Sequence, residues 1–174
     1  WSLEAINGAP NPLQHVIGSV TAEGLRPHLL GNLSVEGTAP PSSKSPGRII
    51  LNGLWIEGAL IVKSGNLDHL SIAHCTLIPE KGGLTVDVSN ANLSLWVDHS
   101  ISGPIAIEDT IQELHIQTSL IDAGASLAIN ASKVPTTVTT STLMGETKIQ
   151  TLEASNSIFT QTVTAERHQE GCVR

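Results

Sequence analysis

A short alternation of apolar and polar residues recurs along the chain, and each copy closes on a small residue. The pattern is apolar, any, apolar, two polar positions, then a small residue that aliphatic residues follow. Strict alternation over so few positions is typical of a short strand with one buried face. Five copies and one earlier variant occur, and their closing positions are Leu54, Cys75, Ser100, Ser119, Ser141 and Ser157.

The spacing of these copies predicts the fold. The closing positions lie 16 to 25 residues apart, whereas the spacing inside a copy does not change. A strand and bend that stack in register on the preceding coil tolerate no insertion, while the turns between copies loop into solvent at little entropic cost. The coils are too long for a left-handed hexapeptide helix. The sequence therefore predicts an all-β fold, a right-handed parallel β-helix of about six to seven short coils.

Stacking of these coils predicts which side chains become neighbours in adjacent coils, about 4.8 Å apart. The predicted inward column is Leu51, Ile72, Val97, Ile116, Val138 and Ala154. Five of the closing residues form a second column of small residues at a sharp bend, where serine hydroxyls bond one another or the turn backbone, and they are Cys75, Ser100, Ser119, Ser141 and Ser157. A further apolar pair follows each bend, and these pairs are Leu60 and Val62, Leu84 and Val86, Ile105 and Ile107, and Leu127 and Ile129, with Ile149 and Val163 as weaker versions.

The ends of the chain follow the same plan less regularly. We expect a single β-helix domain over residues 1–174, with Leu29, Leu33 and Val35 as strand positions of an early coil. Residues 38–47 form a Pro/Ser loop by composition. Residues 1–23 show no clear period and are expected to be an irregular cap on the first coil or the remnant of a longer sequence.

Composition and charge narrow the classes of partner. The net charge is −7, and only 14% of the residues are charged. Without a clustered basic face we expect no nucleic-acid partner. No apolar run approaches the roughly 18 residues of a membrane-spanning helix, so we expect no membrane insertion. Two cysteines, Cys75 and Cys172, are too few for a disulfide scaffold and are expected to be free thiols, with Cys75 buried in the bend column.

The acidic residues do not gather as an enzyme of this fold requires. Polysaccharide lyases of this shape hold Ca²⁺ with acidic residues beside a basic residue, and the hydrolases use several Asp on neighbouring coils. The candidates fall in different predicted columns, and they are Asp68, Asp87, Asp98, Asp109 and Asp122. We therefore predict no catalytic residues and no cofactor.

Two histidines come closest to a metal site. His74 and His99 occupy the same position on consecutive coils, just before the small-residue bend, and Asp98 precedes His99. Two imidazoles one ladder step apart can share a metal ion or a proton. No third ligand follows at Thr118 or Thr140, so two exposed turn histidines are the favoured interpretation. Weak binding of Zn²⁺ by this pair remains a hypothesis.

A second outward column carries Trp96, followed one coil later by His115. An exposed indole beside an imidazole offers a stacking platform for a sugar or a protein partner. Singly exposed aromatic residues are also common and have no functional meaning by themselves. Trp55 follows the bend in its own coil and is expected to belong to the core or a cap.

Several strings resemble a group of bacterial β-helix-repeat proteins of unassigned function. They are NGLWIEG at 52–58, HCTLIP at 74–79, SISGPI at 100–105, SIFT at 157–160 and RHQEGCVR at 167–174. The resemblance implies a bacterial protein whose relatives continue past residue 174, some of them tied to phage-tail-like or contractile particles. It leaves the compartment open but favours a cytoplasmic or particle-associated protein over a disulfide-rich secreted one.

These observations predict a non-catalytic structural or interaction β-solenoid module, part of a larger chain or assembly. Regular aliphatic stacking and Ser/Thr-rich faces suit a scaffold or a binding surface. The expected partners are proteins or glycans, and oligomerisation as a trimer is one expected assembly. The alternative is a carbohydrate-binding or polysaccharide-active β-helix, of lyase or hydrolase type.

Overall fold

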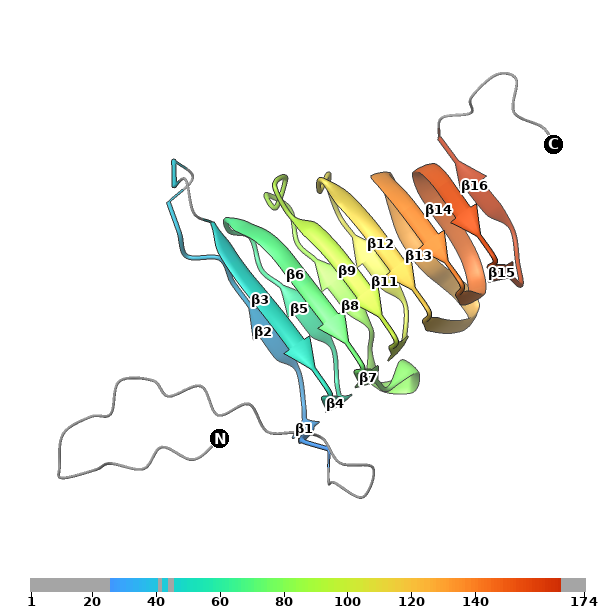
Figure 1. Cartoon of the computed structure of the whole chain (residues 1–174), viewed down its shortest axis with the longest axis horizontal. Coiled ribbons are helices and arrows are strands. Elements are labelled where there is room, and N and C mark those ends of the chain that lie inside the picture. The colour runs from blue at the N-terminus through green and yellow to red at the C-terminus, as the bar shows by residue number, and fades with distance from the viewer. Residues whose placement is uncertain (1–25, 41, 44–45, 167–174) are drawn as a thin grey trace, which may run out of the picture.

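The computed structural model describes residues 26–40, 42–43 and 46–166. These residues form the strands of one parallel sheet, which winds into a β-solenoid of about 5 turns (Figure 1). The predicted all-β parallel β-helix is confirmed. Within the described part of the chain, the only helical element is a short 3-10 turn, η1, at Pro79–Lys81. No helix in the same residues is long and apolar enough to cross a membrane.

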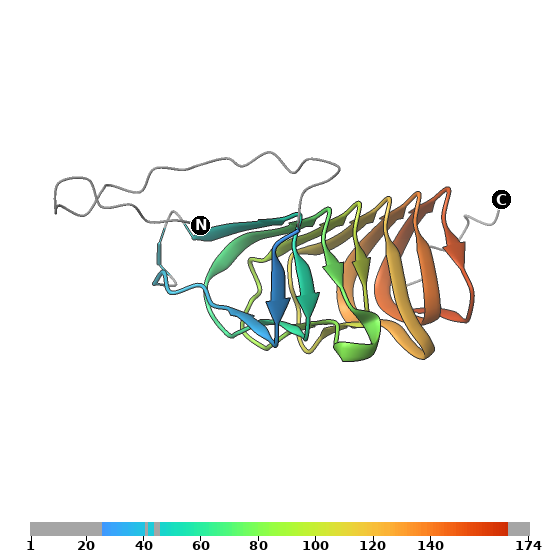
Figure 2. The ribbon, with the colours of Figure 1, turned by 90° about the horizontal axis from the view of Figure 1, so that it is seen from below.

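Each coil contributes to three parallel ladders, and Figure 2 shows successive coils side by side along the long axis. The first ladder contains β3 (Gly47–Asn52), β6 (Leu67–Ala73), β9 (Ser94–Asp98) and β12 (Glu113–Gln117). The second contains β1 (His28–Leu30), β4 (Trp55–Glu57), β7 (Thr76–Leu77), β10 (Ile101–Ser102) and, at its end, β15 (Ile158–Phe159). The third contains β2 (Leu33–Val35), β5 (Leu60–Val62), β8 (Leu84–Val86), β11 (Ile105–Ile107) and, at its end, β16 (Val163–Ala165).

Two long strands complete all three ladders. β13 (Leu120–Thr139) and β14 (Thr142–Ser155) each pass through the second, third and first ladders in turn. The solenoid has about 5 turns, fewer than the six to seven coils predicted from the sequence, because the first and last coils are incomplete. β2 and β3 are joined by the segment that the sequence predicts as a Pro/Ser loop, of which residues 41, 44 and 45 lie outside the described part. The predicted cap at 1–23 and Cys172 also lie outside it.

The predicted inward column is confirmed in register along the first ladder. Leu51 pairs with Ile72, and the pairing continues through Val97, Ile116, Val138 and Ala154. The four middle members are buried, because a coil on either side covers them. Leu51 is only partly buried and Ala154 is exposed, since they lie in the first and last rungs of this ladder. Burial thus depends on position along the rod as well as on alternation.

The predicted alignment of the apolar pairs in the third ladder is confirmed for the early coils and is wrong for one later pair. Leu60, Leu84 and Ile105 share a column, as predicted. The next member of that column is Ile129, whereas the prediction placed Leu127 there. The pairing of β13 with β14 shifts register between Asp122 and Leu127 and again before Ile129. These irregularities absorb extra residues, which a fixed offset from the bend cannot anticipate.

Candidate functional site

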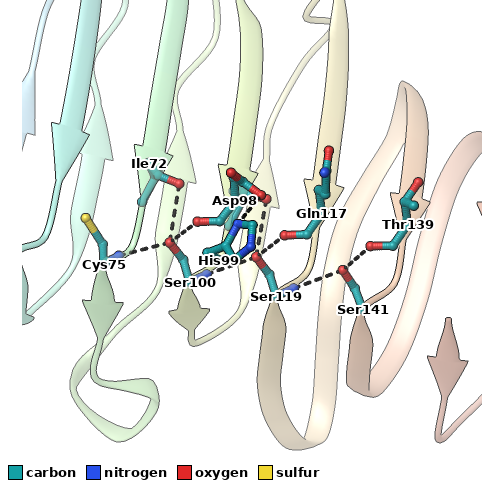
Figure 3. A network of polar contacts seen from close by, with 10 residues as sticks. Ile72, Cys75, Asp98, His99, Ser100, Gln117, Ser119, Thr139 and Ser141 are labelled. Atoms are coloured by element: carbon teal, nitrogen blue, oxygen red, sulfur yellow. Dashed lines mark hydrogen bonds and ion pairs between the residues drawn. The ribbon is translucent and has the colours of Figure 1, made fainter. Parts of the chain in front are cut away.

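The bend between the first and second ladders is held by a column of serine hydroxyls. Each hydroxyl accepts a hydrogen bond from the backbone N–H of the matching residue one coil earlier, at 3.0 to 3.2 Å. Figure 3 shows Ser100 accepting from Cys75, Ser119 from Ser100 and Ser141 from Ser119, and Ser157 accepts from Ser141 in the same way. Each hydroxyl also donates to the carbonyl two residues before it. The small-residue column is confirmed, and its hydroxyls bond backbone rather than one another.

Cys75 starts this column. Its thiol is buried and donates to the carbonyl oxygens of Ala73 and Leu51, at 3.2 and 3.5 Å. Burial raises the pKa of the Cys75 thiol, which disfavours the reactive thiolate. The predicted role as a buried small residue is confirmed.

Replacing Ser119 by alanine is expected to lower the free energy of unfolding by about 2 kcal/mol, because the Ser100 N–H loses its buried acceptor. Ser102 is the matched control: its hydroxyl is also buried but has no hydrogen-bond partner. Ser102→Ala is therefore expected to change the stability far less. Urea unfolding followed by circular dichroism measures both, and equal losses would contradict the proposed role of the Ser119 hydroxyl.

The residue before each closing position has a left-handed backbone. Its φ is 52° at His74, 45° at His99, 47° at Thr118, 50° at Thr140 and 51° at Asn156. Because all five residues share this backbone conformation, their side chains point outward and lie one above the next along the rod. β-Branched threonine is strained in this conformation, whereas asparagine tolerates it well.

His74 and His99 are neighbours, as the sequence predicts. Their ring centroids lie 5.1 Å apart. The Nδ1 atom of His99 lies 2.8 Å from Asp98 Oδ1. Among the described residues, no group of three or more His, Cys, Asp and Glu side chains is placed to hold a metal ion. The three candidates therefore form an imidazole pair with one attached carboxylate.

The outer face of the first ladder brings Trp96 and His115 together. They are register partners on β9 and β12, and their rings stack with centroids 4.1 Å apart at an interplanar angle of 14°. A hydrogen-bonded chain holds the pair: Trp96 Nε1 donates to Ser94 Oγ at 2.8 Å, and Ser94 Oγ donates to Glu113 Oε1 at 2.7 Å. Glu113 Oε2 lies 2.9 Å from His115 Nε2. Hydrogen bonds from His115 and Ser94 lower the pKa of the Glu113 carboxyl.

This geometry restricts what the Trp96 surface can bind. Stacking on His115 covers one face of the indole, and the His69 ring lies 6.4 Å away, tilted by 43°. A sugar that stacks flat on an aromatic ring needs an open face. His115 therefore leaves at most one face of the Trp96 indole for such stacking.

Each aspartate singled out in the sequence has a partner of its own. Asp68 pairs with Arg48 at 2.9 Å, Asp87 with Lys63 at 3.7 Å and Asp109 with Lys133 at 3.0 Å. Asp98 contacts His99, and Asp122 accepts from the Gly124 N–H at 3.0 Å. The hydrogen bond from Lys133 lowers the pKa of Asp109, which makes it a poorer proton donor at neutral pH. No two of these five carboxylates share a partner in these contacts.

The structure contains a second aromatic cluster, formed by Trp55 and His28, which the sequence analysis did not predict. Trp55 is 44% exposed on β4, so it does not belong to the core, one of the two expected assignments. The His28 ring lies 5.7 Å from it, one rung away, and His28 Nε2 lies 3.2 Å from Glu57. Side chains alternate between the two faces of a strand, so the buried Ile56 would have predicted that its neighbour Trp55 lies on the outer surface.

A shallow hollow of about 340 Å³ lies where the third ladder turns into the first. Its lining is Gly37, Ala39, Gly65, Asn66, Ser89, Ala91 and Asn92. None of these lining residues, all of them in the described part of the chain, has a titratable side chain. Comparisons of the chain with protein-family models, curated proteins and solved structures found no significant match.

Proposed function

We propose that this chain is a non-catalytic β-solenoid rod, a structural or interaction module that works within a larger chain or assembly. The observation that carries the proposal is the partial exposure of core-facing side chains in the first and last described coils. Side chains that face the core become only partly buried there: Leu33, Ile49 and Leu51 at one end, and Leu152, Phe159 and Val163 at the other. Partly exposed core residues favour contact with further protein.

The backbone supports the same proposal. A parallel ladder satisfies its N–H and C=O groups through the coil on either side, and among the described residues the first and last rungs each have such a neighbour on one side alone. Between the ends, backbone pairing and the serine column tie each coil to the next. A rod whose end residues can pack against further protein suits a repeating or tail-like assembly. This agrees with the resemblance to proteins linked to phage-tail-like particles.

The proposal is tested by the solution mass, measured by light scattering over a range of concentrations. We expect association that increases with concentration and is lost in Phe159→Glu, because a charge on the last rung disfavours packing at that end. Ile101→Glu is the control, since Ile101 is 41% exposed on the side of the rod. A monomer at every concentration, or an Ile101→Glu variant as impaired as Phe159→Glu, would count against the proposal.

The alternative function is carbohydrate binding or a polysaccharide lyase or hydrolase activity. The observation that favours binding is the hydrogen-bonded cluster of Trp96, Ser94, Glu113 and His115 on one face. A glycan array combined with assays for reducing ends and unsaturated products separates the two. Binding abolished by His115→Ala would support the alternative, and turnover abolished by an Asp→Ala change would end the non-catalytic proposal.

A further inference from the structure

The backbone holds His74 and His99 in one fixed relation. The His74 N–H donates to the Asp98 carbonyl and the His99 N–H to the Gln117 carbonyl, each at 3.1 Å. Both residues share the left-handed conformation of the bend, so their side chains leave consecutive coils in the same direction. The rings are tilted by 39° with centroids 5.1 Å apart. The fold therefore places two imidazoles side by side without a contribution from a flexible loop.

This separation suits two ligands of one metal ion. In a tetrahedral site, a Zn–N bond of about 2.0 Å places two ligating imidazoles with their ring centroids about 5 Å apart. The observed 5.1 Å lies at that value. Both side chains lie at the surface, which leaves room for the two ring nitrogens to turn toward a common ion.

Asp98 prepares one of the two rings for coordination. Its carboxylate only accepts hydrogen bonds, so the Nδ1 atom of His99, at 2.8 Å, carries the proton (Figure 3). Nε2 of His99 then presents its lone pair to an ion. Histidines that bind metals commonly donate their other ring N–H to a carboxylate, which orients the ring and increases its basicity.

We propose that His74 and His99 together bind one Zn²⁺ ion or a related ion that prefers imidazole, with Asp98 as a positioning residue and water in the remaining positions. The Cys75 thiol is buried and engaged with backbone carbonyls, and threonine occupies the bend position of the next two coils. Two imidazoles without a cluster of carboxylates favour Zn²⁺ and Cu²⁺ over Ca²⁺ and Mg²⁺.

The test is calorimetric titration of the chain with ZnCl₂, alongside NMR of the imidazole nitrogens. One ion is expected to bind, with the Nε2 resonance of His99 shifted. His74→Asn and His99→Asn should each weaken binding at least 10-fold, and Asp98→Ala about 10-fold. Asparagine is the matched replacement because Asn156 already occupies the equivalent bend with φ 51°. Equal melting temperatures without metal would show that these variants fold.

His69→Asn is the control, because His69 lies on the first ladder, outside the His74–His99 pair, and this variant should bind Zn²⁺ as the unmodified chain does. Imidazole ligation competes with protons, so affinity should fall at acidic pH. Absence of binding at millimolar Zn²⁺ would overturn the proposal. So would unchanged affinity in His74→Asn or His99→Asn, which would assign the ion to another part of the chain.

Discussion

Gly83→Ala is expected to lower the free energy of unfolding by about 3 kcal/mol or more, because the added methyl group has no room between two coils. A Cβ at this position would overlap the carbonyl oxygen of Pro104 on the next coil and approach the Pro104 nitrogen to 2.8 Å. The neighbouring pair Leu84 and Ile105 is fixed in register, so neither coil can withdraw without breaking the third ladder. Urea unfolding followed by circular dichroism measures the loss.

Gly124→Ala is the matched control for this prediction. Gly124 has a φ of +58°, but a Cβ there would meet nothing within 4 Å. Only the backbone penalty of the left-handed conformation remains, about 1 kcal/mol. If Gly83→Ala cost no more than Gly124→Ala, close approach of the coils would not be what requires glycine at position 83.

Ile116→Ala is expected to destabilise the chain by about 3 kcal/mol. Ile116 is 1% exposed, and its register partners Val97 and Val138 are also buried. Partners held in backbone ladders cannot collapse into the space, so the substitution leaves a cavity along the rod axis. The melting temperature and the urea midpoint should both fall.

Leu51→Ala provides the comparison within the same column. Leu51 lies in the first rung and is only partly buried, so its truncation removes less contact and is expected to cost about 1 kcal/mol. The conservative change Ile116→Val should also cost about 1 kcal/mol. Similar losses for Ile116→Ala and Leu51→Ala would contradict a core whose packing depends on stacked neighbours.

Much of the candidate site could be predicted from the sequence because it follows from the register. Once Ile72, Val97 and Ile116 are aligned, the same offsets place His74 beside His99 and Trp96 beside His115. The interactions inside each cluster could not be predicted in this way. Which nitrogen of His99 meets Asp98, and whether Trp96 shows a face or an edge, depends on side-chain torsions that a repeat pattern does not contain.

The amino-acid sequence alone determined the coil, its bend and the vertical neighbours along the first ladder, because alternation and a rigid spacing between strand and bend admit one stacking register. Only the tertiary structure decided where that register slips near Leu127, that the serine hydroxyls bond the backbone of the preceding coil, and that Ala154 is exposed. Each of these three features depends on which residue of the adjacent coil lies beside a given position. That is a property of contacts between residues roughly twenty positions apart, which no local pattern records.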